Sequence, residues 1–481
     1  MRGFLLLHTM SLLALFLGMA MLLPATAAFF YREGDVSAFL YPALLCFVIG
    51  SFSLLCKGRS KKEISHREGF AIVAFGWVMV AFLGTLPYLL SGTLPSFSDA
   101  FFESVSGFTT TGATVITDIE GVSHAVLLWR SFTQWLGGMG IILLSIAILP
   151  LLGVGGMQLY KAEVPGPVTD KLKPRIGETA KILWQVYLLF TFLEFILLRA
   201  GGMSSFDSLC HSFTTMATGG FSTKNLSVEA YGSAYIEGVI TFFMLLAGVN
   251  FALHYQFLKG NRKALLKDEE FRFYGLILLV STLFILCDLM LTRGLDIFHA
   301  FRLGSFQAVS IMTTTGFSSA DFEKWTGSSQ YLLLVLMFIG GSAGSTGGGM
   351  KVVRIYLLIK QGYRELYRLI HPHAVTHIKF NNGKVSTEIM DSIWGFFFLY
   401  VLLFVLSTLV ISFLGLDPLS AVSAVAASIS NVGPGLGSVG PSDNFSHLHP
   451  LGKWVLSSCM ILGRLELYTL LILFVPEFWN K

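Results

Sequence analysis

Charged side chains are scarce in this chain of 481 residues, at 13% of the total. Soluble domains carry roughly 25% charged residues, so a soluble globular protein is excluded. Apolar runs long enough to cross a bilayer recur from one end of the chain to the other. The formal net charge of +4 is too small to indicate a nucleic-acid partner. The composition predicts an all-α polytopic membrane protein embedded in a lipid bilayer.

Cysteine is also rare, and catalytic patterns are lacking. The five cysteines are scattered and never in CxxC spacing, which favours reduced thiols packed in the membrane domain over disulfides or a metal site. No candidate nucleophile stands in a pattern with a candidate base. We therefore expect no enzymatic activity and name no catalytic residue.

Four short polar stretches rich in Gly and Thr interrupt the apolar sequence. They are Phe108–Thr114, Met216–Phe221, Thr313–Phe317 and Ser430–Pro434. Their central glycines, Gly112, Gly219, Gly316 and Gly433, are 107, 97 and 117 residues apart (219−112, 316−219 and 433−316). Such regular self-similarity indicates one structural unit used four times. Because irregular backbone at membrane depth must be buried in protein or line a cavity, we expect the four loops to surround one pore.

Each polar loop follows a short apolar stretch and precedes a long one. The short stretches, with too few residues to cross a hydrocarbon core of about 30 Å, are expected to enter the membrane and turn back. They are Asp99–Phe108, Phe206–Met216, Phe306–Met312 and Leu419–Ile429. The long stretches after the loops are Ala125–Leu152, Tyr235–Leu258, Tyr331–Gln361 and Leu451–Val475.

The predicted fold is four helix–pore loop–helix repeats around a pseudo-fourfold pore, with two extra transmembrane helices in front. The predicted segments are 1–67 (two leading helices and a basic loop), 68–178 (repeat one), 179–272 (repeat two), 273–390 (repeat three with a cytoplasmic hairpin) and 391–481 (repeat four). The two leading helices and two full spans in each repeat make ten predicted spans. Because basic loops stay in the cytoplasm and the number of spans is even, both termini are expected to lie there. The polar loops then open outward, where Asp118, Glu120, Asp321 and Glu323 would concentrate cations at the mouth.

The four loops have the chemistry of a K⁺ filter. Dehydrating K⁺ requires several backbone carbonyls that point inward, and Gly adopts the necessary dihedral angles without a steric cost. The predicted filter residues are Thr110, Thr111, Gly112, Ala217, Thr218, Gly219, Thr314, Thr315, Gly316, Asn431, Val432 and Gly433.

A gate is predicted below the filter. Ten residues, Gly340–Gly349, interrupt an apolar span with so many glycines that a continuous helix is disfavoured, although a close-packed helix contact is the alternative. Arg464 lies in the final apolar span, where an ionisable side chain indicates function by default; the alternative is a structural pair with Glu466. The predicted gate residues are Gly340, Gly341, Ser342, Gly344, Ser345, Thr346, Gly347, Gly348, Gly349 and Arg464.

The segment Val375–Ser386 alternates at period two around Asn381-Asn382-Gly383, which predicts a cytoplasmic β-hairpin. Hairpin edges commonly dock partners. A hairpin without a partner is the equally weighted alternative.

These motifs, taken in order over essentially the whole chain, resemble the TrkH branch of the Trk/Ktr/HKT superfamily of potassium transporters. The resemblance implies K⁺ uptake across the bacterial inner membrane, with K⁺ as the transported ion and no covalently bound cofactor. It also implies a homodimer with one pore per protomer and a cytosolic TrkA-like ring that binds nucleotide and controls opening. Gly at all four filter positions fits the K⁺-selective members, whereas Asn431-Val432-Gly433 departs most from Thr-Thr-Gly. A departure there would loosen the fourth side of the filter.

Two other functions are weighed against this reading. A secondary transporter of a small organic solute also uses broken helices at the midplane, but it favours twofold repetition. For a membrane-embedded enzyme, the sequence contains no supporting pattern of catalytic residues.

Overall fold

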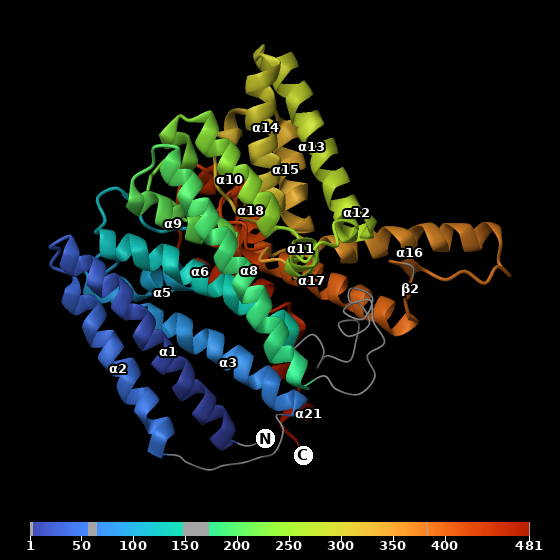
Figure 1. Ribbon diagram of the computed structural model, residues 1–481. Helices are drawn as coiled ribbons and strands as arrows, with labels where there is room; N and C mark the ends of the chain where they lie inside the picture. Colours follow the sequence, from blue (N-terminus) through green and yellow to red (C-terminus); the bar gives the residue numbers. More distant parts are fainter. Residues whose placement is uncertain (1–2, 56–64, 148–172, 382, 481) are drawn as a thin grey trace.

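The computed structural model of this chain describes residues 3–55, 65–147, 173–381 and 383–480. Two helices come first, α1 (Gly3–Phe30) and α2 (Val36–Leu55). They pack against each other, and α1 also packs on α3 and α6 of the first repeat (Figure 1). The leading pair is therefore attached to one side of the repeats.

The remaining elements follow the order helix, pore helix, loop, helix four times. Repeat one contains α3 (His66–Gly84), α4 (Leu86–Leu90), α5 (Phe97–Phe108) and α6 (His124–Ala147). Repeat two contains α8 (Lys173–Ala200), α9 (Ser205–Met216), α10 (Ala234–Ala247), α11 (Phe251–Leu258) and α12 (Lys263–Lys267). Repeat three contains α13 (Glu269–Arg293), α14 (Ile297–Met312), α15 (Gly327–Ile339) and α16 (Val352–Ile370). Repeat four contains α17 (Thr387–Phe413), α18 (Pro418–Ile429), α19 (Pro450–Arg464), α20 (Tyr468–Leu471) and α21 (Pro476–Trp479). The predicted fold class is confirmed.

The short pore helices end where the sequence predicted, at Phe108, Met216, Met312 and Ile429. The third one is longer than predicted, because it begins at Ile297 and not at Phe306. Asp296 caps it there, since its side chain accepts hydrogen bonds from the backbone N–H groups of Phe298 and His299. An acidic residue before an apolar run is the usual signal of such a start.

The described residues include five helices long and apolar enough to cross a membrane, or up to seven if each sharply bent pair counts as one span. Two bends correct the sequence interpretation. The expected single helices Tyr235–Leu258 and Leu451–Val475 are broken, with bends of 101° between α10 and α11 and 108° between α19 and α20. Asn250 starts α11 by accepting a hydrogen bond from the N–H of Ala252. Glu466 and Leu467, directly after α19, have positive φ, which a continuing helix does not allow.

The predicted break in repeat three is confirmed, because α15 ends at Ile339 and α16 begins at Val352. Helix α16 leaves the bundle at a steep angle to α15 (Figure 1). The three breaks contact one another, because the Ser342 N–H donates to the Gly248 carbonyl and Arg464 donates to the Thr346 carbonyl. The break expected from Gly340–Gly349 is therefore one of three that surround one region.

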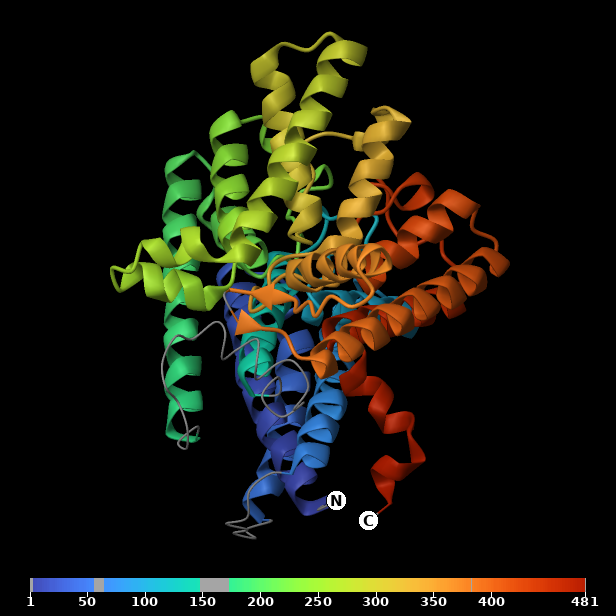
Figure 2. The same ribbon diagram turned by 90° about the vertical axis from the view of Figure 1, so that its right-hand side faces the viewer.

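The predicted hairpin is confirmed as a small one, with β1 (Lys379–Phe380) paired antiparallel to β2 (Gly383–Lys384). It lies against α16 (Figure 2), because Ile378 and Phe380 are buried in a cluster with side chains of α16 and α17. Asn381 is also engaged, since it accepts from the N–H of Glu269 and donates to Asp268 at the start of α13. The hairpin is thus part of the packed structure.

The two ends of the described chain lie at the same end of the molecule in both views (Figures 1 and 2). Arg67, at the start of α3, donates a hydrogen bond of 2.6 Å to the carbonyl of Asn480. Phe478 of α21 is buried against Phe70 and Ala71 of α3. These contacts hold the C-terminal turn against the first repeat.

Candidate ion pore

The four polar loops share one backbone turn. The residue at each pore-helix C-cap is followed by one with positive φ, namely Thr110 (53°), Thr218 (52°), Thr314 (61°) and Asn431 (57°). Two residues further on is a glycine with positive φ, namely Gly112 (85°), Gly220 (76°), Gly316 (79°) and Gly433 (103°). The residue between them donates its N–H to a carbonyl of the pore helix at 2.8–2.9 Å in every loop. The loops are therefore structural copies.

This correspondence corrects the sequence register in the second loop. Ala217 is the C-cap of α9 and has right-handed helical backbone, so it matches Thr109 and not Thr110. The matching triplet is Thr218-Gly219-Gly220, one residue later than predicted. The sequence contains two adjacent glycines there, and the positive φ of Gly220 decides between them.

The loops close into a ring. A Cβ atom placed on each loop glycine would lie very close to a backbone carbonyl oxygen of the next repeat. The distances from this Cβ position are 2.1 Å for Gly112 to Gly219 O, 1.9 Å for Gly220 to Thr315 O, 1.9 Å for Gly316 to Val432 O and 2.6 Å for Gly433 to Thr111 O. Loop one therefore contacts loop two, loop two contacts loop three, loop three contacts loop four, and loop four contacts loop one. The last approach is the widest, on the side where Asn431-Val432-Gly433 departs from Thr-Thr-Gly.

One hollow touches the loop glycines of all four repeats, Gly112, Gly220, Gly316 and Gly433. The charged residues that line it are Arg130, Lys224 and Asp443. The acidic residues Asp118, Glu120, Asp321 and Glu323 are not among the residues that line this hollow. Asp118 and Glu120 instead bond to Asn225 and Lys224, and Asp321 pairs with Lys324. Glu323 lies within contact distance of the Gly440 backbone.

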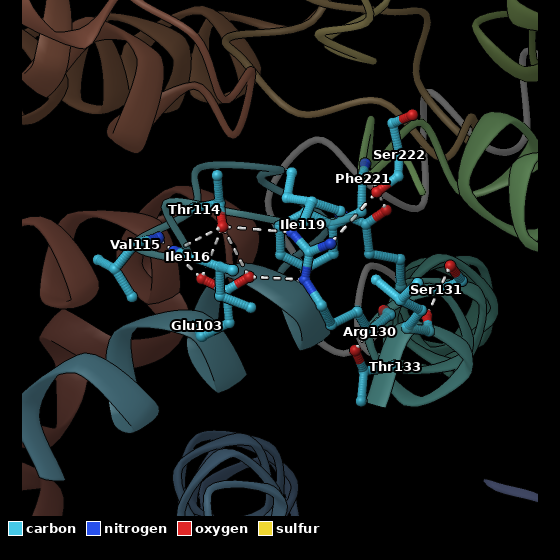
Figure 3. Close-up of polar contacts among 12 residues, drawn as sticks. Glu103, Thr114, Val115, Ile116, Ile119, Arg130, Ser131, Thr133, Phe221 and Ser222 are labelled. Carbon is cyan, nitrogen blue, oxygen red and sulfur yellow. Dashed lines mark hydrogen bonds and ion pairs between the residues drawn. The ribbon is translucent and has the colours of Figure 1, made fainter. Parts of the chain in front are cut away.

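A buried ion pair supports the residues that directly follow the glycines of loops one and two (Figure 3). Glu103 of α5 and Arg130 of α6 are 2.8 Å apart, and both side chains are at most 1% exposed. The Glu103 carboxylate also accepts from the Thr114 hydroxyl and from the Val115 N–H. Arg130 donates to Thr114 and, across to repeat two, to the carbonyl of Ser222. Its guanidinium lies 4.1 Å from the Phe221 ring centroid.

We expect Glu103→Ala to destabilise the protein by about 3–5 kcal/mol, because Arg130 would remain buried without its partner. Thermal unfolding of the purified protein measures this effect. Glu120→Ala is the matched control, because its pair with Lys224 is exposed and is worth about 0–1 kcal/mol. Equal unfolding midpoints for the two variants would contradict the expectation.

The loop between α15 and α16 lies directly against the inner side of the ring. The Thr346 hydroxyl donates to the carbonyls of Met216 and Ala247, at 3.1 and 3.2 Å. The Gly348 N–H donates to the Thr314 hydroxyl at 2.7 Å. A Cβ on Gly348 would lie 2.2 Å from the Ser430 carbonyl oxygen. The loop thus contacts repeats two, three and four beside the turns of their polar loops.

Arg464, buried at the end of α19, joins this loop to the first repeat. Its guanidinium donates to the Thr346 carbonyl at 2.7 Å and to the Gly137 carbonyl of α6 at 3.2 Å. Glu466 pairs instead with Arg354 of α16, at 2.5 Å. The alternative of an Arg464–Glu466 pair is therefore wrong.

Helix α13 holds the two ends of the same loop. The Glu270 carboxylate accepts from the N–H of Ala343 at 2.8 Å and from the N–H of Val353 at 3.1 Å. Val353 lies in the first turn of α16, where a negative charge is favourable. The side chain of Lys351 donates to the Gly347 carbonyl. The glycine-rich loop is consequently ordered by specific polar contacts.

Known proteins resemble this chain along its length. A family model named TrkH and described as a cation transport protein matches residues 36–481. The chain belongs to the TrkH family. The Trk system potassium uptake proteins TrkH of Salmonella typhimurium and Escherichia coli are 46% and 45% identical to it, over 98% of this chain and of each relative. The crystal structure of the potassium transporter TrkH from Vibrio parahaemolyticus has a TM-score of 0.92 and 42% identity, with 100% of both chains covered.

Sequence reasoning missed three polar residues of the pore of this TrkH-family chain: Glu103, Arg130 and Gln134. Arg130 carried the same signal as Arg464, an ionisable side chain inside an apolar span, and so it was detectable. Glu103 carried this signal too, because it is a carboxylate inside the predicted stretch Asp99–Phe108, whereas Gln134 is uncharged and carried none. Only its contact with the second loop distinguishes Gln134.

Proposed function

We propose that this chain is the pore-forming subunit of a Trk-type potassium uptake system in the bacterial inner membrane. The observation that carries the proposal is the closed ring of four loops, each with a left-handed glycine against a carbonyl of the next. A ring of backbone carbonyls can replace the hydration shell of K⁺. Relatives over nearly the whole chain are named potassium uptake proteins, which supports K⁺ as the cargo.

In this proposal the ion contacts backbone oxygens of four equivalent triplets. They are Thr110-Thr111-Gly112, Thr218-Gly219-Gly220, Thr314-Thr315-Gly316 and Asn431-Val432-Gly433. Gly340–Gly349 and Arg464 form the gate below the ring. The ring opens outward, and both termini lie in the cytoplasm together with the basic loops.

Cation flux into liposomes that contain the purified protein tests the function. We expect K⁺ and Rb⁺ to enter faster than Na⁺ and Li⁺. Equal rates for all four ions would overturn the assignment of the ring as a K⁺ filter. No flux of any of them, in protein that remains folded, would overturn cation translocation itself.

We further propose that the protein works as a homodimer and binds a cytosolic TrkA-like ring, which carries the nucleotide. The hairpin remains a candidate contact, because Lys379 and Lys384 are exposed on it. Deleting Asn381–Lys384 would not test this contact alone, because it would also remove the hydrogen bonds of Asn381 to the start of α13.

Reversing both charges, Lys379→Glu with Lys384→Glu, is expected to lower the amount of regulatory ring that co-purifies, by about tenfold. The buried side of the hairpin stays intact in this variant, so the membrane protein should elute unchanged in size. Lys259→Glu with Lys263→Glu, near α12, is the comparison. A loss of binding only in the second variant would place the contact on the loop before α13.

A further inference from the structure

The second loop lacks a side-chain pair that loops one and three contain. In loop one the hydroxyls of Thr109 and Thr111 are 2.8 Å apart, and in loop three those of Thr313 and Thr315 are 2.8 Å apart. Each pair connects the helix C-cap with the middle residue of the filter triplet. The equivalent residues in loop two are Ala217 and Gly219, which have no hydroxyl. The second loop is therefore without this hydroxyl pair.

Gln134 of α6 occupies the corresponding place. Its side-chain Nε2 donates to the carbonyl of Gly219 at 2.7 Å, and its Oε1 accepts from the N–H of Phe221 at 3.1 Å. The side chain is fully buried. The amide nitrogen and the amide oxygen of Gln134 thus both bond to the backbone of loop two, one before Gly220 and one after it.

The contact also explains why residue 219 has no side chain. A Cβ on Gly219 would lie 2.3 Å from the Cδ atom of Gln134 and 2.4 Å from its Oε1 atom. The backbone of Gly219 does not have positive φ, so its conformation permits any residue. Steric overlap with Gln134, and not backbone strain, is the reason for glycine at this position.

The bonded carbonyl lies at a seam of the ring. A Cβ atom placed on Gly112 would lie 2.1 Å from this Gly219 oxygen, so the carbonyl faces the first loop. We propose that Gln134 is a specificity-determining residue that positions this carbonyl and thereby sets the ring dimension between loops one and two. The proposal rests on the proposed function, in which the ring is the K⁺ filter.

The first test is Gln134→Ala, with K⁺ and Na⁺ flux measured in liposomes. Loss of both hydrogen bonds frees the Gly219 carbonyl, and we expect the K⁺/Na⁺ flux ratio to fall about fivefold, equivalent to about 1 kcal/mol. Gln134→Met keeps the approximate side-chain volume but removes both polar groups, so it is expected to lower the ratio as well. Wild-type ratios in both variants would overturn the proposal.

The second test exchanges the two ways of supporting a loop. Gly219→Thr introduces the residue found in loops one and three, and its side chain would overlap with Gln134. We expect this single change to lower the flux ratio more than Gln134→Ala does. Combining it with Gln134→Ala removes the overlap, and at least half of the lost selectivity should return. A double variant no better than Gly219→Thr alone would contradict a direct contact.

Two comparisons separate this proposal from the proposed function. Gln330→Leu removes a carboxamide that donates to the carbonyls of Glu323 and Trp325, away from the ring, and should select like wild type. Gly316→Ser should lower selectivity if the ring is the filter at all. Reduced selectivity in Gly316→Ser together with unchanged Gln134 variants would overturn only the role of Gln134. Unchanged selectivity in both would overturn the filter itself.

Discussion

Serine at position 316 is expected to remove most of the discrimination between K⁺ and Na⁺. Gly316 has φ of +79°, which costs a residue with a side chain about 1–2 kcal/mol. Its Cβ would also lie 1.9 Å from the Val432 carbonyl oxygen, so the backbone of the fourth loop has to move. We expect the K⁺/Na⁺ flux ratio to fall at least about tenfold, or about 1.4 kcal/mol.

Gly112→Ser should act in the same direction, because its Cβ would lie 2.1 Å from the Gly219 oxygen. Gly92→Ser is the matched control. Gly92 has φ of +73° but no atom within 4 Å of its Cβ position, so it reports backbone strain without the ring contact. Wild-type selectivity in both filter variants would mean that these loops are not the filter.

Removing the Arg464 side chain is expected to raise K⁺ flux in the absence of partner and nucleotide. Arg464 is a buried positive charge in the proposed gate, where it would raise the barrier for a cation far more than the same charge in water. It also donates to the carbonyls of Thr346 and Gly137, which ties the loop between α15 and α16 to α6. Hydrogen bonds from charged groups are worth about 1.5–3 kcal/mol, so Arg464→Ala should increase basal flux about tenfold or more.

Deleting Gly344–Gly348 should raise basal flux too, because it removes Thr346 and the Gly348 contact with Thr314. The two changes combined should act less than additively, since they disrupt one contact. Arg199→Ala is the matched control: Arg199 donates to the Met203 carbonyl, in the turn that precedes pore helix α9. Basal flux at the wild-type level in both gate variants, with normal assembly, would place the gate elsewhere.

The sequence alone determined the class of fold, the four repeats and the C-terminal ends of all four pore helices. These features depend on local properties, namely apolar length, helix caps and the conformational freedom of glycine. The break at Gly340–Gly349 was predictable for the same reason, because ten residues rich in glycine disfavour a helix wherever they occur. The hairpin around Asn381 was a local signal as well.

Only the tertiary structure decided how the loops meet. It selected Gly220 over Gly219 as the ring glycine, because contact with Thr315 of the next repeat depends on a segment far away in the sequence. It broke α10 at Gly248, where packing of the neighbouring loop and the Asn250 cap outweigh an apolar sequence that favours a continuous helix. It also brought Gln134 to Gly219, 85 residues further along the chain. Periodicity and composition describe each segment by itself, whereas a ring is defined by distances between segments.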